Sequence, residues 1–399
     1  MSEYFWEADG ILLRVFEERD AECICNMLKD SSARVVCDHG MPLPYGTQDA
    51  QAFIEYAYEG LQRGDTVCLA ISDRQENICG YVNLSRIDER AGFANLCVYV
   101  SEAYRNRGIA AVATTRMLTY AFDERRLHKI AMTIPKTAES ASRFAENIGF
   151  TKEYEKKESY YIDGSYVNEL GYGITEEAFR ARNKRRDEIE TPLPKQDAAI
   201  REDTAGRMEA HASGIDDAKS KSYWQVDELL LRPIREEECI INRELLLESD
   251  AYRFYENTVG LPYFLGEADE QEADCMVMDL DGKRLLFAME DCSGNYVGNV
   301  QLHSIDRRHG TFSFSFFTRK QYRGKGYATK ALRKIITYAF DEMRLHKCEG
   351  TYNEGNDASK RVMEKLGLTY EGTKKETVFY KGTYIDAVCM GITAEEWNR

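Results

Sequence analysis

Alternating and helical hydrophobic patterns follow one another in the C-terminal part of this chain. Phe312, Phe314 and Phe316 alternate with serines, which predicts a strand. A basic turn with two glycines follows. Apolar residues then recur at the spacing of one helical face, at Ala328, Ala331, Leu332, Ile335, Ile336 and Ala339. The pattern therefore predicts a strand, a tight turn and an amphipathic helix in direct succession.

The flanking segments extend this into a layered domain. A short strand is expected from Lys347, and a second helix is expected to end at Gly367, because glycine suits a helix C-cap. Residues 380–383 predict a hairpin turn, and 284–289 with 296–303 predict a hairpin upstream. Strands interleaved with helices in this order predict a mixed α/β fold, a sheet with helices on its faces.

The same pattern occurs earlier in the chain. An offset of 218 positions pairs Tyr104 with Tyr322 and His128 with His346, and 15 of the 26 residues from 104 to 129 are identical to their counterparts. The offset also pairs Gly80 with Gly298 and Gly173 with Gly391. This period is far longer than the 20–50 residues of a solenoid unit, so it indicates duplication of a whole domain.

The duplication sets the domain boundaries. We expect an N-terminal domain over 1–180, a polar linker over 181–222 and a C-terminal domain over 223–399. The linker contains no Phe, Trp, Tyr or Cys and is rich in charged residues and alanine, so it has little to bury. It is expected to be solvated and partly helical.

Composition and charge narrow the class of protein. The net charge of −15 argues against a nucleic-acid partner and is compatible with a cationic substrate. No apolar run is long enough for a membrane span, and the acidic start lacks the features of a signal peptide. Eleven cysteines without a CxxC pair indicate free thiols in a reducing, cytoplasmic setting, and no metal site is expected.

The turn between the strand and the helix carries candidate chemistry. Glycines at 324 and 326 let successive amides converge, and the first amides of a helix lack internal partners. Such a turn can bind a phosphate or pyrophosphate at the positive end of the helix dipole, with Arg323 and Lys325 adding charge at the rim. An ordinary surface turn remains the alternative. The sequence contains neither a Walker loop nor a GxGxxG fingerprint here.

These residues resemble a known superfamily. R-x-x-G-x-A at Arg323 to Ala328, and at Arg105 to Ala110, is similar to the coenzyme-A pyrophosphate motif of GNAT acetyltransferases. The stretch that begins with Asn356 to Ser359 and ends in Lys365-Leu366-Gly367 looks like that superfamily's next motif. The sequences of both motifs most resemble the branch that contains the ribosomal-protein N-terminal acetyltransferases. In the N-terminal copy, 42–45 and 49–54 resemble the early substrate-side helix of that branch.

The resemblance implies two tandem GNAT-like domains, each a mixed, largely antiparallel sheet flanked by helices. It implies acetyl-CoA as cosubstrate and a primary amine as acceptor, either a small molecule or a protein N-terminus, which attacks directly in a ternary complex. Family members commonly pair as dimers, so the duplication implies an intramolecular pseudo-dimer in a monomer or homodimer. The cofactor-binding residues implied are Phe316, Thr318, Arg323, Gly324, Lys325, Gly326, Tyr327, Ala328, Asn356 and Ser359, with Arg105, Arg107, Gly108 and Ala110 in the N-terminal copy.

Catalytic residues are less defined. The tyrosine donor of many family members is replaced by Met363 and Ala145, whereas the family's N-x-x-S serine maps to Ser359. Ser359 could donate a proton to the thiolate, or only bind the cofactor or cap the helix. Glu376 could serve as the base, although a solvated strand carboxylate is the alternative. The matching His128 and His346 are expected to hold the corner between helix and strand.

The two copies are not equivalent. Ala138 and Ala141 stand where the C-terminal copy has Asn356 and Ser359, and Asn106 replaces Gly324. Asn tolerates unusual backbone angles, so the N-terminal turn can keep its shape. We therefore expect the C-terminal copy to be the working site. The alternatives are an active N-terminal copy with its own acceptor, a non-catalytic acetyl-CoA sensor, and a scaffold without a ligand.

Overall fold

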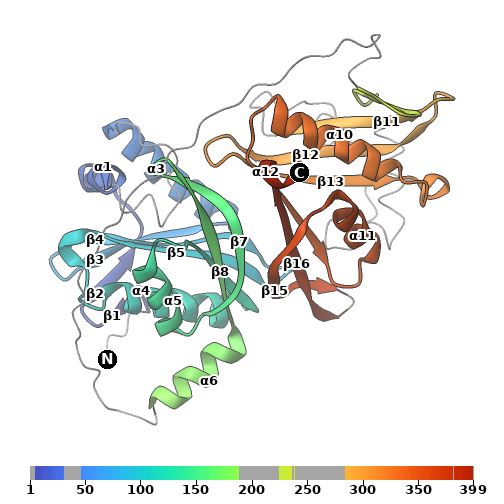
Figure 1. Ribbon diagram of the computed structural model, residues 1–399. Helices are drawn as coiled ribbons and strands as arrows, with labels where there is room; N and C mark the ends of the chain where they lie inside the picture. Colours follow the sequence, from blue (N-terminus) through green and yellow to red (C-terminus); the bar gives the residue numbers. More distant parts are fainter. Residues whose placement is uncertain are drawn as a thin grey trace.

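The computed structural model describes residues 5–30, 46–187, 224–235, 238, 284–380 and 382–398. The chain forms two α/β halves that lie side by side, each with a mixed, largely antiparallel sheet and helices packed on it (Figure 1). The expected fold class is confirmed. Of the segments that resemble the substrate-side helix, 42–45 lies outside the described residues, and 49–54 lies in a helix.

The N-terminal half consists of β1 (Glu7–Ala8), β2 (Ile11–Arg14), α1 (Ala21–Lys29), α3 (Thr47–Arg63), β3 (Val67–Asp73), β4 (Ile78–Asp88), β5 (Phe93–Val100), α4 (Ile109–Thr119), a π-helical turn (Tyr120–Glu124), β6 (Lys129–Pro135), α5 (Glu139–Ile148), β7 (Thr151–Ile162), β8 (Ser165–Thr175) and α6 (Glu176–Asp187). Helix α6 continues past residue 180, where the linker was expected to begin. Most of the expected linker, from residue 188 on, lies outside the described residues.

The described part of the C-terminal half consists of β9 (Gln225–Val226), β10 (Leu229–Arg232), β11 (Leu285–Asp291), β12 (Tyr296–Asp306), β13 (Thr311–Thr318), α10 (Tyr327–Asp341), β14 (Lys347–Asn353), α11 (Asp357–Leu366), β15 (Thr369–Tyr380), β16 (Thr383–Thr393) and α12 (Ala394–Trp397). The expected hairpins are present, and Gly367 ends α11 with a left-handed φ of 89°.

Side-chain alternation along the strands divides the N-terminal core into two layers. Along β3, Val67, Leu69 and Ile71 pack with the layer that contains α4 and α5. Cys68 and Ala70, between them, pack on the opposite face with α1 and α3. Because successive strand side chains point to opposite faces, both faces of this sheet are covered by helices.

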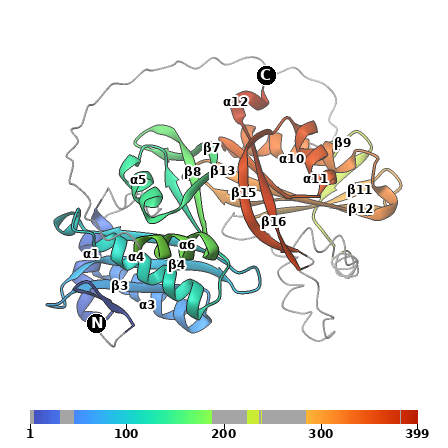
Figure 2. The ribbon, with the colours of Figure 1, turned by 90° about the horizontal axis from the view of Figure 1, so that it is seen from below.

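The two sheets join at their centre. The strand order places β7 beside β15 with Tyr154 opposite Gly372, so one sheet runs through both halves (Figure 2). Gly372 has a φ of 146°, and a Cβ there would lie 2.2 Å from the Cβ of Tyr154. The close approach of the halves therefore requires glycine at this position.

Several of the inter-half contacts recur with the roles of the halves exchanged. His128 Nε2 lies 2.8 Å from Glu376 Oε2, and His346 Nε2 lies 2.6 Å from Glu158 Oε2. Each imidazole also stacks on a tyrosine of the other half, Tyr384 or Tyr166. Buried Lys129 and Lys347 each donate to a backbone carbonyl across the boundary. This exchange is the pseudo-twofold arrangement expected of a fused dimer.

An exposed inter-half ion pair predicts an acid-sensitive contribution to stability. Lys157 Nζ lies 2.6 Å from Glu396 Oε1. This contact and a hydrogen bond from the Thr393 amide together lower the pKa of Glu396 to about 2. A carboxylate with a lowered folded-state pKa stabilises the protein above its unfolded pKa, and this stabilisation is lost as the pH falls towards 2. We expect Glu396→Gln to cost about 0.5–1 kcal/mol in urea unfolding near neutral pH and almost nothing near pH 2.5. A cost independent of pH would contradict this assignment.

Among the residues that the structure describes, no helix has the length and apolar character that a bilayer span requires. The described cysteines are all free thiols.

Candidate active site

The turn before α10 has the conformation that the sequence predicts for an anion-binding loop. Gly324 and Gly326 have φ values of 80° and 81°, and Gly326 is the N-cap of α10. A Cβ added at either glycine would meet no atom within 4 Å, so the space in front of the turn is open. The first amides of α10 therefore lie next to open space at the positive end of the helix.

The N-terminal half keeps this turn despite the substitution at 106. Asn106 adopts a φ of 61°, and Gly108 has a φ of 78° as the N-cap of α4. A Cβ on Gly108 would also meet no atom within 4 Å. The expectation that asparagine preserves the backbone shape is confirmed, because asparagine adopts the left-handed region more readily than most residues.

The arginine that begins each turn ties it to the preceding strand. Arg323 Nε donates to the carbonyl of Thr318 at 2.9 Å, and Arg105 Nε donates to that of Val100 at the same distance. Arg105 also forms an ion pair with Asp30 at 2.9 Å. These arginines thus hold the turn in place, and direct contact with a cofactor remains a prediction for both.

The strand before each turn parts from its neighbour. The parallel pairing of β5 with β6 covers Phe93 to Asn95 and ends there, and that of β13 with β14 covers Thr311 to Ser313. Beyond these points no pairing joins the two strands, so they diverge over 96–100 and 314–318. The expected cofactor residues Phe316 and Thr318 lie on the diverging part of β13, half-buried.

The next motif is a capped helix in the C-terminal half. The Asn356 side chain, at the N-cap of α11, accepts a hydrogen bond from the Ser359 amide at 3.1 Å. In the N-terminal half, Ala138 occupies the N-cap of α5 and no side chain caps the helix. Asn356 therefore has a structural role here, and its contact with a cofactor remains a prediction. The Ser359 side chain is half-buried at the start of α11.

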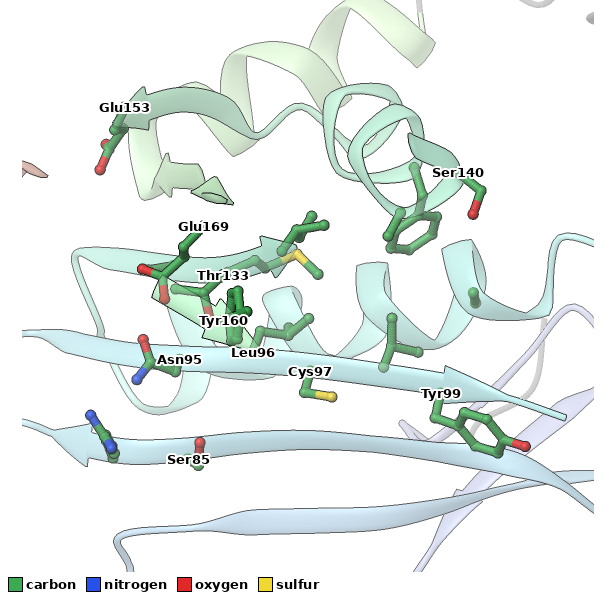
Figure 3. A pocket seen from close by; sticks show the side chains of 18 of the residues that line it. Ser85, Asn95, Leu96, Cys97, Tyr99, Thr133, Ser140, Glu153, Tyr160 and Glu169 are labelled. Carbon is green, nitrogen blue, oxygen red and sulfur yellow. The ribbon is translucent and has the colours of Figure 1, made fainter. Parts of the chain in front are cut away.

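A cavity of about 790 Å³ connects these features in the N-terminal half (Figure 3). It is bounded by the turn, the diverging strands and α5. Of the four cofactor residues predicted in this half, Arg105, Gly108 and Ala110 line the cavity, and so does Ala141, the counterpart of Ser359. The turn and the strand opening of this half therefore belong to one continuous site.

The far end of this cavity holds carboxylates that the sequence analysis did not single out. Glu169 of β8 and Glu349 of β14 both reach Lys156 of β7, with Oε–Nζ distances of 3.6 and 2.7 Å. Burial opposes the charge on Lys156, but Glu169 and then Glu349 raise its pKa well above the ordinary value. Burial likewise opposes the charge on Glu349, yet Lys156 keeps the pKa of Glu349 below its ordinary value.

Comparison with known proteins identifies the fold and its cosubstrate. The model of the acetyltransferase (GNAT) domain family matches residues 11–151 and again 228–369. The chain belongs to the GNAT acetyltransferase family. It is an acyltransferase with two tandem domains, and its acyl donor is acetyl-CoA.

Several relatives are similar over one domain. An SPbeta prophage-derived uncharacterized N-acetyltransferase, YokL, of Bacillus subtilis is 29% identical over 44% of this chain and 96% of its own length. A putative ribosomal N-acetyltransferase, YdaF, of B. subtilis is 32% identical over 26% of this chain and 57% of its length. Spermidine N(1)-acetyltransferase of Escherichia coli is 29% identical over 27% of this chain and 58% of its own length. The chain thus spans less than two thirds of the last two proteins.

Among solved structures, a spermidine N-acetyltransferase from Vibrio cholerae in complex with CoA and spermine is similar with a TM-score of 0.39. Its sequence identity is 23%, over 43% of this chain and 99% of that one.

The GNAT residues present here fit an acetyl-CoA pyrophosphate. The two left-handed positions of each turn, the open space above them and the helix amides together form a site for an anionic group. Lys325 lies 5.3 Å from the centre of the Tyr322 ring, which keeps its ammonium beside the turn. The part of the chain that the structure describes holds no group of three or more His, Cys, Asp or Glu placed to bind a metal ion.

Glu376, the predicted base, lies at the boundary between the halves. It has a φ of 49°, in a bulge of β15, and its carboxylate contacts His128 of the other GNAT domain. The side chains of His128 and His346 bond across the boundary between the halves, which the sequence analysis did not foresee, and their role at the corner between helix and strand stays a prediction. The role of Glu376 as a base and that of Ser359 as a proton donor stay predictions.

The carboxylates that were missed had a signal in the repeat. The 218-residue offset pairs Glu169 with Ala387 and Glu349 with Ala131, so each acid stands opposite an alanine. A strand position that is charged in one copy and alanine in the other shows where the two sites differ, and this signal could have identified Glu169 and Glu349.

Proposed function

We propose that this chain transfers the acetyl group of acetyl-CoA to the amino group of a cationic small-molecule amine. The observation that supports this most is the single cavity lined both by the turn around Gly108 and by the carboxylates Glu169 and Glu349. Carboxylates stabilise bound ammonium groups, and the net charge of −15 attracts cations to the protein. Relatives named as spermidine N-acetyltransferases act on such an amine.

Different groups of the chain bind the cosubstrate, stabilise the oxyanion and transfer protons. The amides at the start of α4 or α10, with Lys325 in the C-terminal half, bind the diphosphate. Acetyl-CoA supplies an acetyl group activated as a thioester. Backbone N–H groups on the diverging part of β5 or β13 stabilise negative charge on the carbonyl oxygen as the amine attacks. In the C-terminal half, Ser359 gives a proton to the departing thiolate, and Glu376 is the candidate acceptor of the amine's proton.

Sequence and structure favour different halves as the site of the reaction. Asn356 and Ser359 favour the C-terminal half, as the sequence analysis expects. The N-terminal half has the described cavity. Residues 239–283 of the C-terminal half lie outside the described residues. We therefore propose transfer by the intact chain, and substitutions at Gly108 and Gly326 in the two turns assign it to a half.

Release of free thiol tests the proposal. The purified chain is incubated with acetyl-CoA and either spermidine, an aminoglycoside or a short peptide with a free N-terminus. We expect thiol release above background hydrolysis with spermidine, and a fall in the apparent on-rate for spermidine at high salt, because salt screens attraction between charges. If no amine raises thiol release while CoA still binds in calorimetry, the protein is an acetyl-CoA-binding protein and the proposal fails. If CoA does not bind either, it is a scaffold.

A further inference from the structure

The acceptor end of the N-terminal cavity is built by both halves of the chain. The side chains of the C-terminal half that line it come from β12, the turn after it, β13, β14 and β15. They are Asp306, His309, Thr311, Glu349, Lys374 and Thr377. A cavity that begins at the turn of one domain thus ends against the other domain.

An acidic cluster occupies this shared end. Lys156 lies between Glu169 of its own half and Glu349 of the other half, and Ser159 Oγ donates to Glu349 Oε1 at 3.0 Å. The three charged side chains are only 13–18% exposed. Two carboxylates share one ammonium, so this cluster of three side chains has one more negative than positive charge, and Lys374 of the other half lines the same end of the cavity. Figure 3 shows Glu169 directed into the cavity beside Thr133.

The interface itself does not require this cluster. The pseudo-twofold counterparts of Glu349 and Glu169 are Ala131 and Ala387, whereas the other inter-half contacts of His128, Lys129 and their mates recur on both sides. Alanines are therefore sufficient to pack the equivalent place. Burying carboxylates carries a desolvation cost, so their presence on one side alone points to binding rather than packing.

A histidine of the C-terminal half shapes the same wall. His309 is buried, its Nδ1 accepts a hydrogen bond from the Tyr161 amide at 2.9 Å, and its ring meets that of Tyr160 edge to face. Because Nδ1 accepts, it carries no proton. The N-terminal counterpart of His309 is Ala91. The shared end thus differs from its pseudo-twofold mate in a third residue, and this residue also comes from the other half.

We propose that the N-terminal cavity is an acceptor site shared by the two halves, in which Glu169 and Glu349 bind an ammonium group of a diamine or polyamine. The inference rests on the proposed function for the chemistry of the acceptor. The attacking amine must be neutral, so a carboxylate pair serves a second ammonium of the same molecule, which remains charged. Glu349 is then a specificity-determining residue that the C-terminal domain contributes to the N-terminal site.

Charge removal at Glu349 tests this assignment. Glu349→Gln keeps the shape of the side chain and its ability to bond to Ser159 and Lys156. With CoA at saturation, we expect spermidine to bind the full-length variant at least fivefold more weakly in calorimetry, and Glu169→Gln to do the same. In thiol release, the preference for spermidine over butylamine is expected to fall by a similar factor, because butylamine has no second ammonium.

A matched variant separates the site from the interface. Glu396→Gln also removes an inter-half ion pair but lies outside the cavity, so it is expected to leave spermidine affinity within twofold. Spermidine affinity unchanged in both Glu349→Gln and Glu169→Gln, or no spermidine binding to the wild type, overturns the shared acceptor site. If spermidine affinity falls as expected in these variants but no thiol is released, the shared binding site is supported and the proposed acetyl transfer is contradicted.

Discussion

Gly326→Asp is expected to weaken CoA binding at the C-terminal half by roughly thirty- to several-hundred-fold. Gly326 has a φ of 81°, and its Cβ would meet no atom within 4 Å, so the new side chain extends into the open space above the turn. A carboxylate there stands next to a bound diphosphate, and like charges about 4 Å apart repel by up to about 4 kcal/mol at the protein surface. Calorimetric titration of the full chain with CoA measures the loss.

Gly326→Asn is the matched control. Asparagine has the same shape as aspartate and tolerates the left-handed region, as Asn106 demonstrates with a φ of 61° in the equivalent turn. We expect it to retain CoA affinity within about threefold of the wild type, a difference of less than about 1 kcal/mol. Equal affinities of the aspartate and asparagine variants would mean that the diphosphate does not bind at this turn.

The corresponding pair at Gly108 assigns turnover to a half. If Gly326→Asp abolishes thiol release and Gly108→Asp does not, the C-terminal half is the working site, as Asn356 and Ser359 suggest. The opposite result assigns transfer to the half with the described cavity. Loss of turnover in both single variants indicates that the halves work only together.

The sequence predicts the fold well because the fold depends on local patterns. Alternation at Phe312 to Phe316, the helical face from Ala328 and the glycine at 367 each correspond to an element that the structure contains. Because the domain is duplicated, each of these patterns can be checked against its counterpart 218 positions earlier. The phosphate-binding turn is equally predictable, since its backbone shape is determined by Gly324 and Gly326 themselves.

The acceptor end of the site could not be predicted in the same way. Glu169 and Glu349 are 180 positions apart and meet only because β7 and β15 pair at the centre of the sheet. Side-chain alternation along its strand left Glu376 as either a base in its own half or a solvated strand carboxylate. A bulge in β15 interrupts that alternation and turns its carboxylate to His128. Tertiary pairing and bulges are not encoded in a local pattern.

Lys347→Met is expected to destabilise the protein by about 3–5 kcal/mol in urea unfolding. Lys347 is fully buried, with Nζ 2.5 Å from Glu371 Oε1, and it also donates to the Lys157 carbonyl of the other half. Methionine fills a similar volume but leaves Glu371, 7% exposed, as an unpaired buried carboxylate. Among the residues that the structure describes, Glu371 Oε2 has no hydrogen-bond partner, so the carboxylate depends on Lys347 for its ion pair.

The double variant Lys347→Met/Glu371→Gln separates the charge from the packing. Glutamine can still accept the hydrogen bond that the Lys157 amide gives to Glu371 at 2.9 Å, but it carries no charge. We expect it to recover most of the lost stability, because the cost comes from the isolated carboxylate. Lys129→Met and Lys129→Met/Glu153→Gln form the equivalent pair on the other side of the pseudo-twofold axis, where Lys129 lies 2.7 Å from Glu153.

The pH dependence of Lys347→Met provides the last check. Burial raises the pKa of Glu371 in the wild type, while Lys347 opposes this rise. Without the lysine, the pKa of Glu371 rises further, and the folded state then binds a proton more readily than the unfolded state does. Stability of the variant relative to wild type should therefore be lowest near pH 8 and improve as the pH falls towards 5. A deficit that stays constant over this range, or that the double variant does not relieve, would place the cost in lost packing at the boundary between the halves.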